Sequence, residues 1–213
     1  MIRLDHLVLP VESLEPAADT LARNGFVVTP QTEHPFGTAN RLVVFENAYV
    51  ELVTVVDLDR LPPAGFARRV AEHLASGAAG FSHVACAADS VTDAGDDVRR
   101  NDGVPGEPMW FSRRAPRSDG SELTASFTLL PIDGVPEVFF CVHHTPTAVW
   151  FGPHLRHPNG AERIRHASTS IVLPFEVDPV DTGGPAVESD GSHPPFDIGG
   201  VWFSGRSALE AGA

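Results

Sequence analysis

In the first thirty residues the spacing of the apolar side chains changes from strand-like to helical and back again. This order predicts a strand, a helix and a second strand. Residues 4–10 are an apolar run of strand length, and residues 13–24 carry apolar side chains at helical spacing. Gly25 comes just after the last periodic position, where a left-handed helix C-cap is expected, and residues 26–29 return to an extended pattern. The chain therefore begins with a β-α-β pattern.

Two more apolar strands are predicted at residues 41–45 and 49–56. The three residues between them, Glu46-Asn47-Ala48, resemble a turn, so the simplest connection is a hairpin. This hairpin completes a βαβββ unit.

The same order of elements returns after a bridge that contains a predicted helix at residues 66–76. Residues 81–86 repeat the pattern of residues 4–9, with a histidine at the same place in each. A polar helix is predicted at residues 90–101, and it is followed by extended segments at residues 109–114, 123–130 and 137–143.

We therefore predict an α+β fold of two paired βαβββ modules, whose strongly curved mixed sheets form a shared cleft, plus a C-terminal extension. Residues 165–174 resemble the first strand a third time but have no helix after them, and residues 175–213 are rich in Pro, Gly, Asp and Ser. We expect this tail to be partly ordered and its last residues to fray. The expected divisions are a first module at 1–60, a helical linker at 61–79, a second module at 80–150 and the extension at 151–213.

The net charge and the distribution of apolar residues argue against nucleic acids and membranes as binding partners. The chain has 15 Lys and Arg against 28 Asp and Glu, a net charge of −13, which repels both phosphate backbones and anionic lipids. No apolar run reaches the roughly 20 residues of a membrane helix, and the N-terminus lacks the pattern of a signal peptide. We expect a cytoplasmic protein that binds neither nucleic acid nor membrane, with Cys86 and Cys141 as reduced thiols.

Three residues stand out as candidate metal ligands. His6 and His83 occupy matching places in the first strands of the two modules, and Glu51 lies inside the otherwise apolar last strand of the first. A single histidine in a strand is more often satisfied by hydrogen bonds than used as a ligand, but the matching pair favours a shared role. An ionised carboxylate in an apolar strand needs a partner, and two imidazoles with one carboxylate can hold a divalent ion with open positions.

Three segments resemble the glyoxalase-like branch of the vicinal oxygen chelate superfamily: LDHLVLPV, HPFGTANRLVVFENAYVELV and FFCVHHTPTAVW. The resemblance covers about residues 2–173. It implies paired βαβββ modules and, in many members, a divalent ion held by two histidines and carboxylates. It also implies isomerase, lyase, epimerase, ring-cleaving dioxygenase or antibiotic-resistance chemistry.

Carried over by position, the resemblance makes His6, Glu51 and His83 the first three ligands. The position that matches Glu51 in the second module falls on Phe139 or Phe140, neither of which can ligate a metal. The fourth ligand is therefore missing from its usual place.

Two other residues could take the fourth position. His143 could do so only if its strand slips or bends, and Glu137 has the right parity but lies near the strand start. The candidate bases for proton transfer are His143 and, if it is released from the metal, Glu51. We expect one of His143 and His144 to face the pocket, before Pro146 ends the strand.

The substrate-binding candidates are His34 and Asn40, in a loop that the resemblance places at the pocket rim, with an ordinary turn as the alternative. Aromatic residues could line the cleft, although more of them are expected in the core; these are Trp110, Phe111, Phe139, Phe140, Trp150 and Phe151. The arginines at 113, 114 and 117 could clamp a carboxylate, but a solvated loop is the favoured interpretation.

The predicted function is an isomerase or lyase that uses a divalent metal (Zn, Ni, Mn, Mg or Fe) on a small apolar or aromatic substrate with vicinal oxygens. One alternative is a metal-free protein that binds a small molecule or confers resistance, which the missing ligand favours. A further alternative is an iron-dependent dioxygenase, because two histidines and a carboxylate also activate dioxygen on iron. A homodimer is compatible with the sequence.

Overall fold

The computed structural model describes residues 1–117 and 119–205 of the chain. These residues form an α+β fold with a mixed sheet and three α-helices, α1 (Leu14–Arg23), α2 (Phe66–Ala75) and α3 (Val91–Arg100). The three predicted helices are thus confirmed, each to within one residue at either end. Within the described ranges, no helix has the length and apolar character needed to cross a membrane. Short 3-10 helices occur at Leu58–Arg60, Pro146–Ala148 and Gly152–Leu155.

The first group of strands, together with α1, is called the first module here. In it, β1 lies beside β4 in parallel, and β3 pairs with both β2 and β4 in antiparallel fashion. The extended segment predicted at 26–29 is not a strand, although the Thr29 amide donates to the Leu42 carbonyl at 2.9 Å. Pro30 follows and has no N–H to continue the ladder, which explains this error. The bounds are β1 Ile2–Pro10, β2 Thr32–Glu33, β3 Thr38–Val44 and β4 Tyr49–Val55.

The second group of strands, with α3, is called the second module and repeats the pairing of the first. In it, β5 lies parallel to β8, and β7 pairs antiparallel with both β6 and β8. The two modules join where β1 and β5 pair in antiparallel fashion. The bounds are β5 His83–Ala87, β6 Met109–Pro116, β7 Glu122–Ile132 and β8 Val135–His143.

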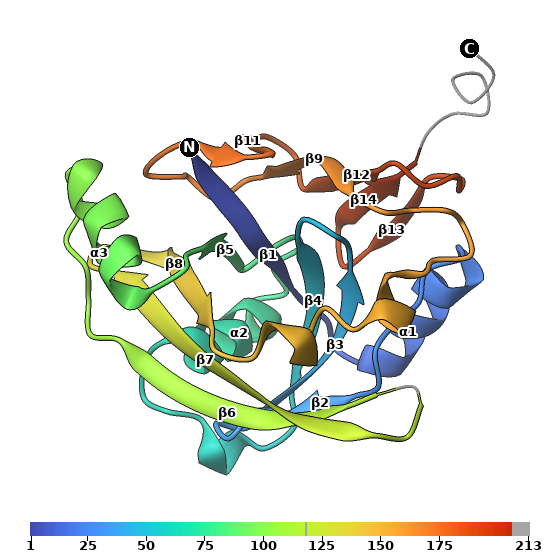
Figure 1. Cartoon of the computed structure of the whole chain (residues 1–213), viewed down its shortest axis with the longest axis horizontal. Coiled ribbons are helices and arrows are strands. Elements are labelled where there is room, and N and C mark those ends of the chain that lie inside the picture. The colour runs from blue at the N-terminus through green and yellow to red at the C-terminus, as the bar shows by residue number, and fades with distance from the viewer. Residues whose placement is uncertain (118, 206–213) are drawn as a thin grey trace.

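A third group of strands follows the second module and continues the same sheet. Its β10 pairs with the start of β1, in the register Ile2 with Val177. The segment expected as a partly ordered extension therefore forms regular strands up to residue 204, whereas residues 206–213, expected to fray, lie outside the described residues. In Figure 1 these strands run along the top of the view, with β6 and β7 at the bottom. They are β9 Ile164–Thr169, β10 Val177–Asp178, β11 Val180–Thr182, β12 Ala186–Ser189, β13 Phe196–Ile198 and β14 Val201–Ser204.

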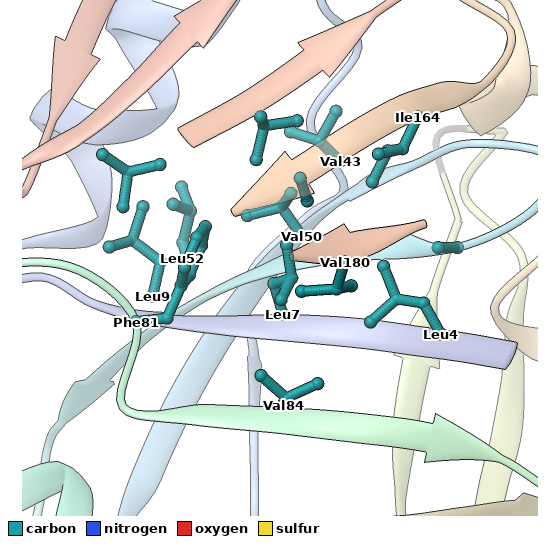
Figure 2. Packing of buried hydrophobic residues seen from close by; sticks show 14 of the residues in the cluster. Leu4, Leu7, Leu9, Val43, Val50, Leu52, Phe81, Val84, Ile164 and Val180 are labelled. Carbon is teal, nitrogen blue, oxygen red and sulfur yellow. The ribbon is translucent and has the colours of Figure 1, made fainter. Parts of the chain in front are cut away.

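The central strand β1 is buried on both faces, which explains its nearly continuous apolar sequence. Leu7 and Leu9 project into the large core together with Val50 of β4 and Val180 of β11 (Figure 2). Val8 points to the opposite face, into a smaller cluster under α2. One face of β1 therefore packs against the third group of strands, and the other face is free to carry polar side chains toward the second module.

Candidate functional site

A β-bulge in β1 places two consecutive polar side chains together. Leu4 pairs with Cys86 of β5 and His6 pairs with Ala85, so Asp5 is an extra residue between two regular pairs. Such a bulge interrupts the alternation of faces and re-aims side chains. Asp5 and His6 consequently lie side by side and buried, each with 4% of its surface exposed.

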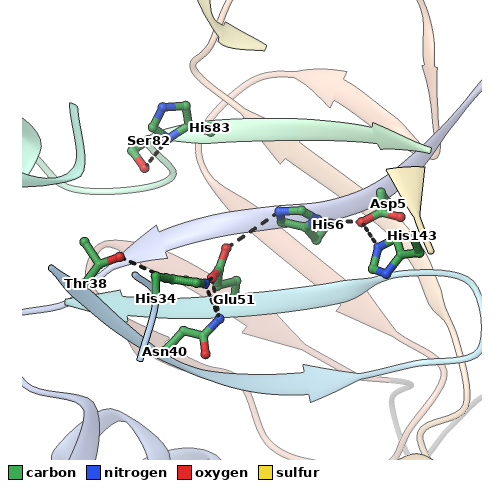
Figure 3. Close-up of polar contacts among 9 residues, drawn as sticks. All are labelled: Asp5, His6, His34, Thr38, Asn40, Glu51, Ser82, His83 and His143. Carbon is green, nitrogen blue, oxygen red and sulfur yellow. Dashed lines mark hydrogen bonds and ion pairs between the residues drawn. The ribbon is translucent and has the colours of Figure 1, made fainter. Parts of the chain in front are cut away.

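Asp5 is held between two histidines. Its Oδ1 lies 2.6 Å from Nδ1 of His6 and 3.0 Å from Nε2 of His143 in β8 (Figure 3). Burial alone would raise the pKa of the Asp5 carboxyl, but the charges and hydrogen bonds of His143 and His6 outweigh it and hold that pKa well below its usual range. Asp5 is therefore an acceptor only, and both ring nitrogens must donate to it.

Because Nδ1 of His6 donates to Asp5, Nε2 is the nitrogen directed at Glu51. The distance from His6 Nε2 to Glu51 Oε2 is 3.6 Å, and both side chains are buried. Glu51 comes from β4, where its backbone pairs with Val8, two residues beyond His6 in β1. The amide of Asn40 donates to Glu51 Oε1 at 2.6 Å, which fixes the carboxylate and leaves Oε2 toward His6.

His34 approaches the other oxygen of the same carboxylate. Its Nε2 lies 3.6 Å from Glu51 Oε1 and 3.3 Å from the Asn40 amide nitrogen, while Nδ1 is 2.9 Å from the Thr38 hydroxyl. Burial, with the nearby charges of Arg113 and His6, lowers the pKa of His34 well below its usual value, so the ring is neutral at pH 7. The neutral ring accepts from Asn40 through Nε2 and donates to Thr38 through Nδ1.

These side chains border a small, partly open cavity of about 30 Å³, enough for one or two water-sized groups. Its walls come from β1, β3 and β4 of the first module and β6, β7 and β8 of the second. Five phenylalanines form much of the lining, together with Tyr49, which stacks on His6 with 4.4 Å between ring centroids. The polar lining residues are His6, His34, Asn40, Glu51 and Arg113.

The residues predicted from sequence fall into two groups. His6, Glu51, His34, Asn40 and Phe139 are brought together around the cavity. His143 lies behind His6, through its bond to Asp5, and is not in the cavity wall.

Three other predicted residues lie elsewhere. The ring of His83 lies apart from His6 and Glu51 in Figure 3 and packs against Phe66 at the start of α2. Its Nδ1 contacts the Ser82 hydroxyl at 2.9 Å, and its buried Nε2 has no hydrogen-bond partner among the described residues. Trp110 is 64% exposed, and the exposed His144 contacts the Thr128 hydroxyl.

Sequence reasoning missed one residue of the site and set another aside. Asp5 was passed over because strict alternation along a strand turns neighbours to opposite faces, and only the bulge turns it inward. Arg113 was assigned to a solvated loop, but it lies in β6 and shares its face with Phe111, which also lines the cavity. That alternation was the signal that could have identified Arg113.

Two groups of side chains could be considered as metal ligands. Atoms of Asp5, His6 and Cys141 lie within 4.8 Å of one another. Asp5 already accepts two hydrogen bonds there, and burial raises the pKa of the Cys141 thiol well above its usual value, which disfavours the thiolate that a metal requires. This first group fits an ion poorly.

The second group is His6, Glu51 and His34, and its donors are better suited. Both imidazoles have Nδ1 engaged by an oxygen and turn Nε2 toward Glu51, the usual arrangement of metal-ligating histidines. His6 and His34 approach different oxygens of Glu51, at 3.6 Å each, and the three side chains do not present three donor atoms within 4.8 Å of one another, so an ion would have to draw them together. The residue types of this group and the engagement of both Nδ1 atoms fit a divalent ion.

Residues 4–172 match the glyoxalase-like domain family, and the chain belongs to this family. A hypothetical protein from Staphylococcus aureus has the same fold, with 13% identity and a TM-score of 0.62 over 95% of this chain and 98% of that chain.

Two other solved structures are more distantly similar. A hypothetical protein from Bacillus halodurans is 16% identical over 67% of this chain and 93% of its own. Methylmalonyl-CoA epimerase from Mycobacterium tuberculosis is 15% identical over 66% of this chain and 86% of its own, and both have TM-scores of 0.46. No curated protein matches the sequence.

Proposed function

We propose that this protein is an isomerase or lyase that moves a proton on a small organic substrate, with the aid of a divalent metal ion. The observation that carries the proposal is the convergence of His6 Nε2 and His34 Nε2 on the two oxygens of Glu51, at 3.6 Å each, beside a buried cavity. A buried carboxylate between two imidazoles is costly without a charge-neutralising partner. It is well suited to hold a cation and to exchange protons.

His6, Glu51 and His34 are the residues that would hold the ion. When bound, the ion would supply positive charge beside a substrate oxygen and so stabilise negative charge that develops there. Two imidazoles and one carboxylate favour Zn, Fe or Ni over Mg, which prefers oxygen ligands alone. His83, the third ligand expected from the sequence, would have to rotate away from α2 to reach the same point.

The proton transfer is assigned to Glu51. Asn40 binds Oε1 and keeps Oε2 directed toward His6 and the cavity, so Oε2, once released from the ion, would take a proton from a substrate carbon and return it to a neighbouring atom. Asp5 and His143 contribute indirectly. Asp5 fixes the tautomer of His6 through its hydrogen bond to Nδ1, and His143 stabilises the charge of Asp5. The phenylalanine lining keeps water away from the transfer.

One observation favours a second candidate. Phe139 is one of the two residues to which the resemblance assigns the position of the fourth ligand, and its ring centroid is 5.7 Å from that of His6. With Phe139 and four more phenylalanines in the lining, the cavity could instead bind a hydrophobic small molecule without any metal. The dioxygenase alternative shares the donor set of the main proposal and differs only in requiring iron.

Elemental analysis of the purified protein separates these candidates. We expect stoichiometric metal in the wild-type protein and its loss in the His6→Ala and Glu51→Ala variants, with folding verified by circular dichroism. His166→Ala is the matched control, because His166 lies on the surface and pairs with Asp181. Absence of metal after reconstitution with Zn, Ni, Mn and Fe would contradict the metal-dependent function and favour the binding protein.

A second measurement tests the reaction type. Small carboxylic and oxo acids are incubated with the protein in D₂O, and exchange of C–H for C–D is followed by proton NMR. We expect exchange with the wild-type protein and at least a 100-fold slower rate with Glu51→Gln. Consumption of dioxygen by the iron-loaded protein, without exchange, would favour the dioxygenase instead.

A further inference from the structure

Arg113 is a buried cation that forms no ion pair with a carboxylate of the described residues. It lies in the middle of β6, paired with Ala125 of β7, and only 9% of its surface is exposed. Its Nη1 donates to the Arg114 carbonyl at 3.2 Å, and its Nε has no hydrogen-bond partner in the described part of the chain. No Asp or Glu of residues 1–117 or 119–205 comes within 4.0 Å of the guanidinium, whereas Arg114 next to it pairs with Glu122.

A guanidinium in such a place needs a partner. Arginine keeps its charge in proteins, so burial cannot neutralise it, and an unpaired buried charge is strongly unfavourable. The ring of Phe127, with its centroid 5.4 Å from Cζ, gives only partial compensation. Glu51 lines the same cavity and its charge favours the charged form of Arg113, but its oxygens face Asn40 and the two histidines and do not pair with the guanidinium.

We propose that the guanidinium of Arg113 binds the carboxylate of the substrate, and that the site is therefore specific for small carboxylic acids. This inference rests on the proposed function and adds the substrate class to it. Arg113 and Glu51 line one cavity, so an acid held at Arg113 presents its carbon chain to Glu51 and His6. Arginine suits this role because its planar donors match both oxygens of a carboxylate.

The cavity lining limits the size and the polarity of the rest of the substrate. A cavity of about 30 Å³ admits a carboxylate and little more, so the acid is short or carries its bulk toward the rim. The rim is apolar, since Phe36 stacks on His34 and lies 5.2 Å, between ring centroids, from Phe111. A short acid with an apolar substituent fits these walls best.

Binding of simple acids tests the proposal directly. Acetate, pyruvate and benzoate are titrated into the purified protein by calorimetry, with acetamide and benzamide as uncharged equivalents. We expect at least one acid to bind tenfold or more tightly than its amide, and Arg113→Met to lose at least tenfold in that affinity. Arg114→Met is the matched control and should bind like the wild-type protein, because Arg114 is exposed and paired with Glu122.

Thermal stability separates binding from a purely structural role. Arg113→Met removes a buried charge that forms no ion pair, at the loss of its attraction to Glu51, and it retains most of the side-chain volume, so the variant should have about the stability of the wild-type protein. Failure of every acid to bind the wild-type protein, or equal binding by Arg113→Met, would overturn the inference. Acid binding through Arg113 without any C–H exchange would leave the inference standing and reject the proposed function.

Discussion

The carboxylate of Asp5 lies 2.6 Å from Nδ1 of His6, and this contact determines which ring nitrogen of His6 is directed toward the cavity. With Nδ1–H donated to Asp5, the Nε2 lone pair points toward Glu51. A neighbour one residue away in the chain thus sets the chemistry of His6, and it can do so because the bulge in β1 turns both side chains to the same side.

Asp5→Asn should weaken metal binding while the fold persists. The asparagine amide can donate to Nδ1 and so favour the tautomer with a proton on Nε2, which cannot ligate. We expect a loss of about 10- to 100-fold in metal affinity, measured by competition with a chelator. Asp89→Asn is the control, because Asp89 is 90% exposed and forms only a surface pair with Arg3. Unchanged affinity in Asp5→Asn would show that Asp5 does not orient His6.

The third metal ligand can be identified by comparing two histidine variants. We expect His34→Gln to lower metal affinity at least tenfold, because Nε2 of His34 faces Glu51. His83→Gln should retain affinity within a few-fold, because His83 packs against Phe66 and bonds to Ser82. The same chelator competition measures both. The reverse result would restore the ligand set expected from the sequence and would require the His83 ring to turn.

Stability should fall as the pH drops below about 6.5, in part because of His83. Burial, with a smaller effect of the charge on Arg69, lowers the pKa of His83 to about 3, against about 6.5 in an unfolded chain. Between these values the unfolded state binds a proton that the folded state does not, so stability is full above pH 6.5 and is lost toward pH 3. His83 contributes up to about 1.4 kcal/mol for each pH unit in that window.

Urea unfolding at pH 7 and pH 4.5 measures this effect. The His83→Gln variant should show a smaller fall in the free energy of unfolding between the two pH values than the wild-type protein. An equal fall in both proteins would mean that His83 does not titrate differently in the folded and unfolded states.

Two adjacent residues in β14 test whether the third group of strands belongs to the core. Phe203 is 2% exposed and packs in the cluster that contains Leu7 and Leu9, whereas Trp202 is 51% exposed. We expect Phe203→Ala to lower the free energy of unfolding by about 3–5 kcal/mol. Trp202→Ala should change it by about 0.5 kcal/mol or less. A single cooperative unfolding transition unaffected by Phe203→Ala would mean that these strands are not part of the folding unit.

Local pattern was sufficient for most of the fold. Each helix follows from apolar spacing, as in α1, where Leu14, Ala17, Ala18 and Leu21 are the buried residues. The repeated order of elements, with a histidine in β1 and at the start of β5, also predicted the two modules. The strands after residue 175 were not predicted, because short strands among Pro, Gly and Asp become stable only by pairing with strands distant in sequence, as β10 does with β1.

The sequence by itself determined the three helices and most strands of the two modules, and it singled out His6 and Glu51, because periodicity and an isolated charge in an apolar strand are local properties. Only the tertiary structure decided which of these side chains meet. The bulge that turns Asp5 inward and the direction of the His83 ring depend on the pairing of β1 with β5 and on the packing of α2. The burial of Arg113 depends on how the two modules close around the cavity, and the distance between residues along the chain carries no information about that closure.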